Sequence, residues 1–224
     1  MKLYYARGAC SLSDRIALHE AGIPFVQERV DLASGLTETG RNFRELNPKG
    51  YVPLLVLDDG RTLTENVAVL SLIADRAPHL QPEGDLGRIR LLEALSFISS
   101  ELHVAFKPLF RESGQTRREA ALNRIAGLLQ VLAGQVRGDF LLGGRFTVAD
   151  AYLFVVLRWA GQFGIVVPAR LTDHFRRVEA RPLVRQSLRE EALPPAAAIG
   201  RIGSGLAAGA LGEVLRSASA ARAR

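Results

Sequence analysis

Apolar and polar residues alternate in short segments of the first 80 residues and recur at helical spacing between them. Four such segments predict strands, at residues 2–5, 25–31, 52–57 and 61–64. Three segments with apolar residues three or four apart predict helices, at residues 11–22, about 38–46 and 65–76. Asp58-Asp59-Gly60 joins the last two strands with residues typical of a hairpin turn. The expected order is β-α-β-α-β-β-α, an α/β domain.

The pattern changes around residues 81–87, a stretch containing Pro and Gly that predicts a linker. Beyond it, every long segment up to residue 193 has helical spacing. Three helix starts are expected, at the capping boxes Thr116–Glu119 and Thr147–Asp150 and at Thr172-Asp173. We therefore expect a first domain over residues 1–80 and an all-helical bundle over 88–193.

Composition favours a soluble cytoplasmic protein. The chain has 224 residues, of which 48% are hydrophobic, so it can bury a large core without metals or disulfides. One cysteine excludes a disulfide framework, and no apolar run is long enough to cross a bilayer. For the latter reason we expect no membrane partner. We also expect no metal, because the four histidines and one cysteine do not have the spacing of metal ligands.

The net charge of +6 does not predict nucleic-acid binding, because half of the excess falls in the tail at residues 194–224. This segment is rich in Ala, Gly and Arg, and we expect it to be disordered.

The chain's only cysteine, Cys10, stands between the first strand and the first helix. Backbone N–H groups and the helix dipole favour a thiolate at such a place, which predicts a reactive sulfur with a depressed pKa. The pattern Cys10-Ser11-Leu12-Ser13 is a C-x-x-S, which cannot form an internal disulfide and suits a small thiol as partner. The alternative is that Cys10 is merely a small buried residue.

Four motifs carry a resemblance to a known family. They are MKLYYARGACSL at residues 1–12, the segments Asn47-Pro48-Lys49-Gly50-Tyr51-Val52-Pro53 and Leu63-Thr64-Glu65-Asn66, and FTVADAY at residues 146–152. Together they resemble the cytosolic glutathione S-transferases, and the first is similar to the bacterial beta class. The resemblance covers residues 1 to about 193. It implies a thioredoxin-like N-terminal domain, a helical C-terminal domain, a homodimer, and glutathione as co-substrate with no other cofactor.

The resemblance also implies roles for single residues. Cys10 and His103 are expected to be catalytic, with a protonated His103 favouring the thiolate. The expected glutathione site consists of Cys10, Lys49, Val52, Pro53, Glu65, Asn66 and His103. Pro53 is expected to follow a cis peptide bond. The expected pocket for the electrophile contains Ala9, Phe106 and Phe110, to which Trp159 and Phe163 are weaker additions.

Simpler interpretations stand beside these roles. Glu65 is also a first-turn acid that stabilises its helix, Lys49 is also a solvated loop residue, and the aromatic residues are also ordinary core. Gly35 stands where many beta-class members carry a lysine for the glycyl carboxylate, so one cation is missing.

The expected activity is conjugation of glutathione to apolar electrophiles, with mixed-disulfide chemistry at Cys10. The alternatives are a glutathione-dependent disulfide reductase or peroxidase, and a non-catalytic binding protein of the same fold.

Overall fold

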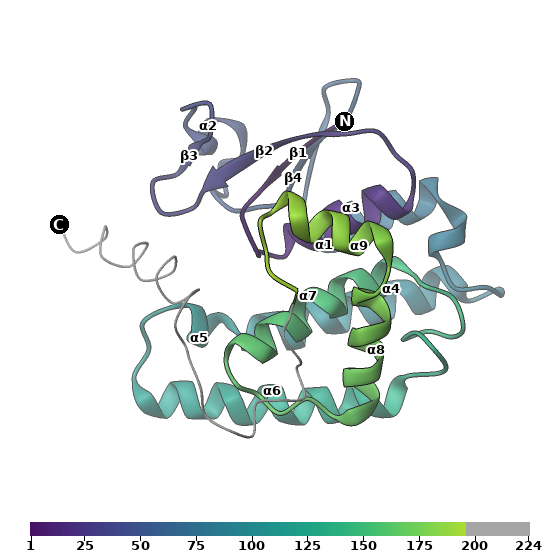
Figure 1. Cartoon of the computed structure of the whole chain (residues 1–224). Coiled ribbons are helices and arrows are strands. Elements are labelled where there is room, and N and C mark those ends of the chain that lie inside the picture. The colour runs from purple at the N-terminus through teal and green to yellow at the C-terminus, as the bar shows by residue number, and fades with distance from the viewer. Residues whose placement is uncertain (196–224) are drawn as a thin grey trace.

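A five-stranded mixed sheet forms the first part of the computed structural model, which describes residues 1–195 (Figure 1). Its strands are β1 Lys2–Tyr5, β2 Val26–Asp31, β3 Leu36–Thr37, β4 Leu54–Val56 and β5 Thr62–Thr64. The order across the sheet is β3-β2-β1-β4-β5, and β1 runs parallel to β2 whereas the other neighbours are antiparallel. The predicted tail from residue 196 onward lies outside the described residues.

Three helices belong to the sheet region, α1 Ser11–Glu20, α2 Phe43–Leu46 and α3 Asn66–Arg76. In Figure 1, α1 and α3 lie between the sheet and the helices of the second half, and both contact α7. The helix expected from residue 38 begins only at Phe43, because Gly40 turns the chain with a φ of 82° and Asn42 caps the helix through its side chain. Strand β3 was not predicted, since two residues give no alternating pattern.

The second half is helical in every long segment, as expected. Its elements are η1 Pro78–Leu80, α4 Gly87–Phe97, the π-helical η2 Ile98–His103, α5 Lys107–Phe110, α6 Gln115–Gln135, α7 Val148–Gln162, α8 Ala169–Glu179 and α9 Pro182–Glu190. Helix α7 is the centre of the core, because every residue from Val148 to Ala160 is buried. It contacts α1, α3, α4, η2 and α8, so the helical half packs directly on the first domain's helices.

One of the three predicted helix starts is confirmed. Thr147 and Asp150 form the capping box of α7, with 2.8 Å between Thr147 Oγ1 and Asp150 Oδ2. The other two are wrong. Thr116 lies inside the first turn of α6, where Glu119 binds Gln115 instead of reaching back to a cap. Thr172 is buried within α8, and its hydroxyl donates to backbone carbonyls of the preceding turn.

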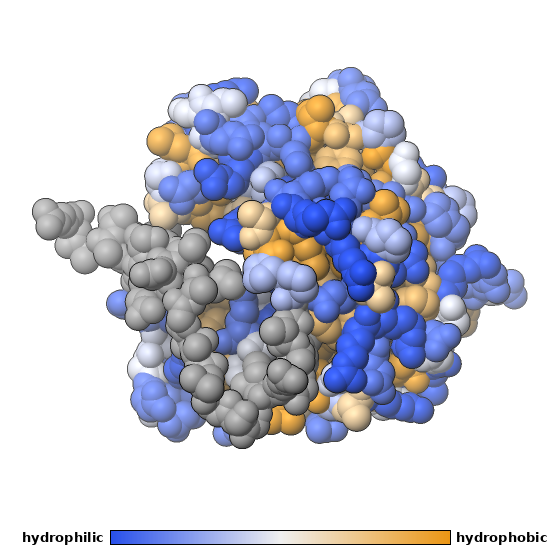
Figure 2. All heavy atoms as spheres, viewed as in Figure 1, coloured by the Kyte–Doolittle hydropathy of each residue, from blue (hydrophilic) through white to orange (hydrophobic). Residues whose placement is uncertain are grey.

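Hydrophilic side chains cover much of the face shown in Figure 2, with hydrophobic patches between them. Within residues 1–195, no helix is both long and apolar enough to span a membrane.

Candidate functional site

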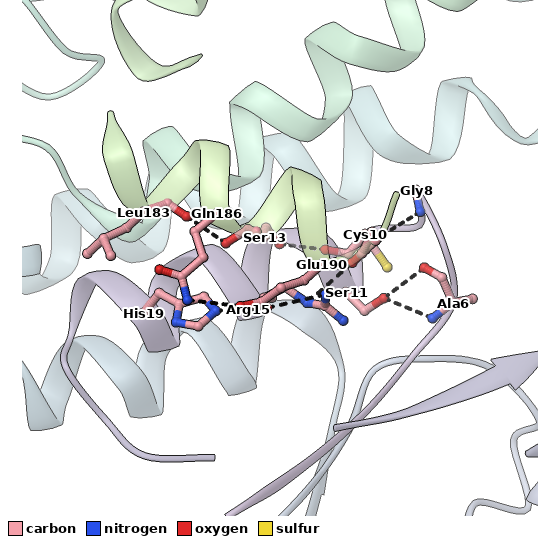
Figure 3. Close-up of polar contacts among 12 residues, drawn as sticks. Ala6, Gly8, Cys10, Ser11, Ser13, Arg15, His19, Leu183, Gln186 and Glu190 are labelled. Atoms are coloured by element: carbon pink, nitrogen blue, oxygen red, sulfur yellow. Dashed lines mark hydrogen bonds and ion pairs between the residues drawn. The ribbon is translucent and has the colours of Figure 1, made fainter. Parts of the chain in front are cut away.

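Cys10 is the N-cap residue of α1 and follows a tight turn at residues 6–10 (Figure 3). The hydroxyl of Ser11 closes this turn, because its Oγ lies 3.3 Å from the Ala6 nitrogen and 3.4 Å from the Ala6 oxygen. Gly8 has a φ of 69°, a left-handed conformation that favours glycine. The local sequence thus fixes where the sulfur stands.

The helical half holds the same turn from the other side. The Gly8 amide donates to Glu191 Oε2 at 2.7 Å, and Trp159 Nε1 donates to the Gly8 carbonyl at 2.8 Å. Glu191 also lies beside the fully buried Arg15, with 3.6 Å between Oε1 and Nε. Both ends of the Gly8 backbone are therefore fixed by residues far along the chain.

Cys10 is buried and its surroundings favour the thiol. Its Sγ donates to the carbonyl oxygen of Val52 at 3.6 Å. Burial raises the pKa of Cys10 above its ordinary value, and the charge of Asp14 adds to this, although the backbone N–H groups of Ser11 and Cys10 oppose it. The expectation of a depressed pKa is therefore wrong for the unliganded protein.

Val52 and Pro53 bring the backbone before β4 to the sulfur. The Val52-Pro53 peptide bond is cis, as predicted. Both residues are buried, so Val52 contributes its backbone to the site and not its side chain.

Glu65, Lys49 and Tyr51 form a polar cluster at the start of α3. Glu65 Oε1 lies 2.5 Å from Lys49 Nζ and 2.7 Å from the Tyr51 hydroxyl, and these two hydrogen bonds lower the pKa of the carboxyl. Glu65 also has a φ of 72°, which a side chain other than glycine rarely adopts. Backbone strain of this kind is common at binding sites.

Asn66 is the first residue of α3, and its side chain points into the protein. Its Nδ2 donates to Ser13 Oγ at 3.0 Å, and Ser13 in turn donates to the Cys10 carbonyl at 2.7 Å. The side-chain amide therefore connects α3 to α1. What Asn66 offers at the helix N-terminus is its backbone N–H.

His103 is paired with Tyr152 of α7 and not with Cys10. Its Nδ1 lies 2.6 Å from the Tyr152 hydroxyl, and its ring contacts Trp159 edge-on at a centroid distance of 4.8 Å. Burial lowers the pKa of His103 to about 4, with a smaller contribution from the charge of Lys107. The imidazole is thus neutral at pH 7, contrary to the expected protonated form.

Four aromatic residues cluster beside the turn of Cys10. Trp159 contacts Phe106 and Phe110 at centroid distances of 5.7 Å and 5.1 Å, and Phe110 contacts Phe163 at 5.3 Å. Phe106 is fully buried, so it packs behind the other three aromatic residues. The prediction that it lines a pocket is therefore wrong. Phe110, Phe163 and Ala9 are only partly buried.

The structure adds residues that the sequence pattern did not single out. Tyr51 joins the Glu65 cluster, Tyr152 binds His103, and Glu191 binds the Gly8 amide. Tyr152 lay within a recognised motif, but the motif concerns the helix cap and gave no signal for this role. Asp14 and Arg15 are charged residues in a helix buried on several sides, which only the tertiary structure reveals.

Comparisons with known proteins agree with this architecture. Residues 9–76 match the N-terminal domain and residues 97–182 the C-terminal domain of glutathione S-transferase. Glutathione S-transferase GstA of Escherichia coli O157:H7 is 38% identical over 202 residues, covering 86% of this chain and 100% of GstA. The chain therefore belongs to the glutathione S-transferase family, and its fold and enzyme class are those predicted.

Two solved structures extend this comparison. The ternary complex of BphK, a bacterial glutathione transferase, has a TM-score of 0.83 at 46% identity, covering 86% of this chain and all of BphK. The beta-class glutathione S-transferase of Sphingomonas chungbukensis has a TM-score of 0.80 at 41% identity, covering 87% of this chain and all of that one. The resemblance to the beta class is thereby supported.

Proposed function

We propose that this transferase binds glutathione where Cys10, the Val52 backbone and the start of α3 meet, and joins its sulfur to small apolar electrophiles. The convergence of these three elements is the observation that carries the proposal. Cys10 Sγ lies 3.6 Å from the Val52 carbonyl, and Glu65 is near enough for its charge to raise the pKa of Cys10. The site therefore combines a thiol, the backbone of Val52 and a carboxylate.

Each part suits one portion of the tripeptide. The backbone of Val52, preceding Pro53, pairs with the cysteinyl portion of glutathione. The backbone N–H groups at the start of α3 suit the γ-glutamyl carboxylate. Glu65 receives the ammonium, and because Lys49 and Tyr51 both bind Oε1, the second oxygen can accept it.

Positive charge for the glycyl carboxylate comes from two residues in this proposal. Lys49 has its ammonium group at the Glu65 cluster. Arg44 lines a cavity of about 110 Å³ together with Gly35 and Gly50. A guanidinium there offsets the cation that is missing at Gly35.

The electrophile is expected against the partly buried aromatic residues Phe110 and Phe163, with Ala9 beside the thiol. Trp159 packs against these aromatic residues and donates a hydrogen bond to Gly8, so it connects the proposed pocket to the turn that carries Cys10. The comparisons do not favour the alternatives of a disulfide reductase, a peroxidase or a non-catalytic carrier.

Calorimetric titration with glutathione tests the binding site. Glu65→Gln removes the charge that receives the ammonium, so we expect an affinity loss of about tenfold or more. Glu93→Gln on α4 is the matched control, since this exposed glutamate pairs with Arg90 and should leave affinity unchanged. Equal affinities of wild type and Glu65→Gln would place the site elsewhere. Turnover of an activated aryl halide then measures conjugation.

Three further proposals come from the family. We infer a homodimer in the cytoplasm, with domains divided at residues 81–87. The segment between η1 and α4 supports this division, because it separates the sheet region from the long helices. Sedimentation at micromolar concentration is expected to give twice the chain mass of 24.4 kDa, and a clean monomer would reject the dimer.

A further inference from the structure

His103 is the last residue of the π-helical stretch η2, which lies between α4 and α5. Such a stretch is rare, occurs mostly as a single turn within an α-helix and is frequent at functional sites. Helix η2 packs against α7, the central helix of the core, which carries both Tyr152 and Trp159. The irregular turn therefore ends with a histidine that is held against the core.

The hydrogen bond between Tyr152 and His103 runs from the phenol to the imidazole. The Tyr152 oxygen lies 2.6 Å from His103 Nδ1. Hydrogen bonds from O–H donors are as short as about 2.5 Å, whereas those from N–H donors are about 2.7–3.2 Å long. The distance is thus typical of a donating hydroxyl. Nδ1 is then the acceptor, and a neutral ring carries its single proton on Nε2.

The surroundings of the two groups favour the same arrangement. Burial raises the pKa of Tyr152, while Ser99 and Asn66 oppose this as hydrogen-bond donors to the phenol oxygen. Burial lowers the pKa of His103 to about 4, so the ring is neutral at pH 7. The reverse bond, from Nδ1–H to the phenol, would give the oxygen of a fully buried tyrosine a further donor and its own proton no acceptor in His103.

The same imidazole borders the turn that carries the thiol. Trp159 contacts the His103 ring edge-on at a centroid distance of 4.8 Å and donates to the Gly8 carbonyl at 2.8 Å, two residues before Cys10. The His103 side chain is partly buried, and within residues 1–195 its Nε2 forms no hydrogen bond. An N–H group without a protein partner is therefore held beside the proposed glutathione site.

We propose that Tyr152 is a positioning residue that fixes the Nε2–H tautomer of His103 and directs this N–H to the sulfur of bound glutathione. The role toward glutathione rests on the proposed function, whereas the tautomer concerns the protein alone.

The N–H group acts as a fixed donor and keeps its proton. A hydrogen bond to the charged form of the glutathione thiol lowers the pKa of that thiol, whose proton passes to water. The thiolate sulfur then forms a bond to the electrophilic carbon, and the leaving group departs with its bonding electrons. Because Tyr152 orients the donor before the reaction, no reorganisation is needed during it.

Nitrogen NMR of His103 in the full chain at pH 7 tests the tautomer without glutathione. We expect the proton on Nε2 and the signal of an acceptor nitrogen at Nδ1, both assigned by their loss in His103→Gln. Tyr152→Phe removes only the hydroxyl and should give a mixture of tautomers. Tyr4→Phe is the control, because it removes the hydroxyl of another buried tyrosine, which packs against Phe43, and should leave the His103 signals unchanged.

Two results would overturn the proposal at this stage. One is a proton on Nδ1 of the wild type, which decides the tautomer even if Tyr152→Phe does not fold. The other is an unchanged His103 spectrum in folded Tyr152→Phe.

Turnover of an activated aryl halide tests whether Tyr152 acts through His103. We expect Tyr152→Phe to lower kcat about fivefold with little change in the KM for glutathione, and His103→Ala to lower it at least as much. The double variant should be no slower than His103→Ala alone, whereas a merely structural role of Tyr152 would give additive losses and contradict the proposal. A wild type that binds no glutathione would instead overturn the proposed function, and the NMR result would still decide the tautomer.

Discussion

Replacing His103 by glutamine is expected to remove a large pH dependence of stability. The imidazole is partly buried, and this burial lowers its pKa to about 4 from an ordinary value of 6.5. Its Nδ1 lies 2.6 Å from the Tyr152 hydroxyl, and a glutamine amide can replace this hydrogen bond. The variant therefore removes the titration while keeping a polar partner for Tyr152.

The sign and size follow from the two pKa values. Between pH 4 and 6.5 the unfolded histidine binds a proton that the folded one excludes, so acid favours unfolding. The contribution is fully present above pH 6.5 and is lost as the pH falls to about 4. A difference of 2.5 pH units corresponds to about 3 kcal/mol in the free energy of unfolding.

Urea unfolding at a series of pH values from 4 to 8 measures this contribution. The stability of the wild type minus that of His103→Gln should rise by about 3 kcal/mol across the window. His79→Gln, which replaces an exposed histidine, is the control substitution. A flat difference for His103→Gln, or an NMR titration of His103 near pH 6.5, would show that burial does not lower the pKa of this imidazole.

Two other predictions concern the scaffold of the site. Asp150 is buried and forms four hydrogen bonds of 2.8 Å each, to the backbone amides of Leu141 and Thr147, to the Thr147 hydroxyl and to His174. Asp150→Ala is therefore expected to lower the free energy of unfolding by about 3–5 kcal/mol, as measured in urea titrations. A loss below 1 kcal/mol would mean that the capping box contributes little. Burial raises the pKa of Glu191 to about 7, so the test is made at pH 8, where the carboxylate predominates. Glu191→Gln then weakens the hydrogen bond to the Gly8 amide by removing this charge, and calorimetry should show glutathione affinity reduced about tenfold. Glu190→Gln, next to it but without a contact to Gly8, should bind as the wild type does; equal losses in both variants would contradict a specific role for Glu191.

Local patterns predicted most of the fold because they depend on neighbours in the chain. Alternation identified four of the five strands, and the spacing from Thr147 to Asp150 identified the start of the central helix α7. The start of α8 was missed because Thr172 has the residue type of a cap but is buried and binds carbonyls of the preceding turn. The identity of a capping residue therefore predicts a helix start only where its surroundings leave it at the helix end.

The predicted site residues fall into two groups in the structure. Cys10, Val52 and Glu65 lie together, because each adjoins one of the strands β1, β4 and β5, which are neighbours in the sheet. The partners of His103 and Asn66 depend on packing between distant elements. His103 binds Tyr152, and the Asn66 amide binds Ser13. Sequence spacing does not show which of several polar neighbours such a side chain will bind.

The ionisation of Cys10 shows most clearly where local reasoning ends. The backbone N–H groups at the start of α1 lower the pKa of the thiol, as the position in sequence predicts, but this effect is smaller than the opposing effect of burial. The turn that carries Cys10 is held by distant parts of the chain, because Trp159 of α7 and Glu191 after α9 both form hydrogen bonds to Gly8. Asp14 then adds a negative charge from the same helix. A cysteine at a helix N-terminus is therefore activated only if the rest of the fold leaves it in water or supplies a cation, and here the fold does neither in the unliganded protein.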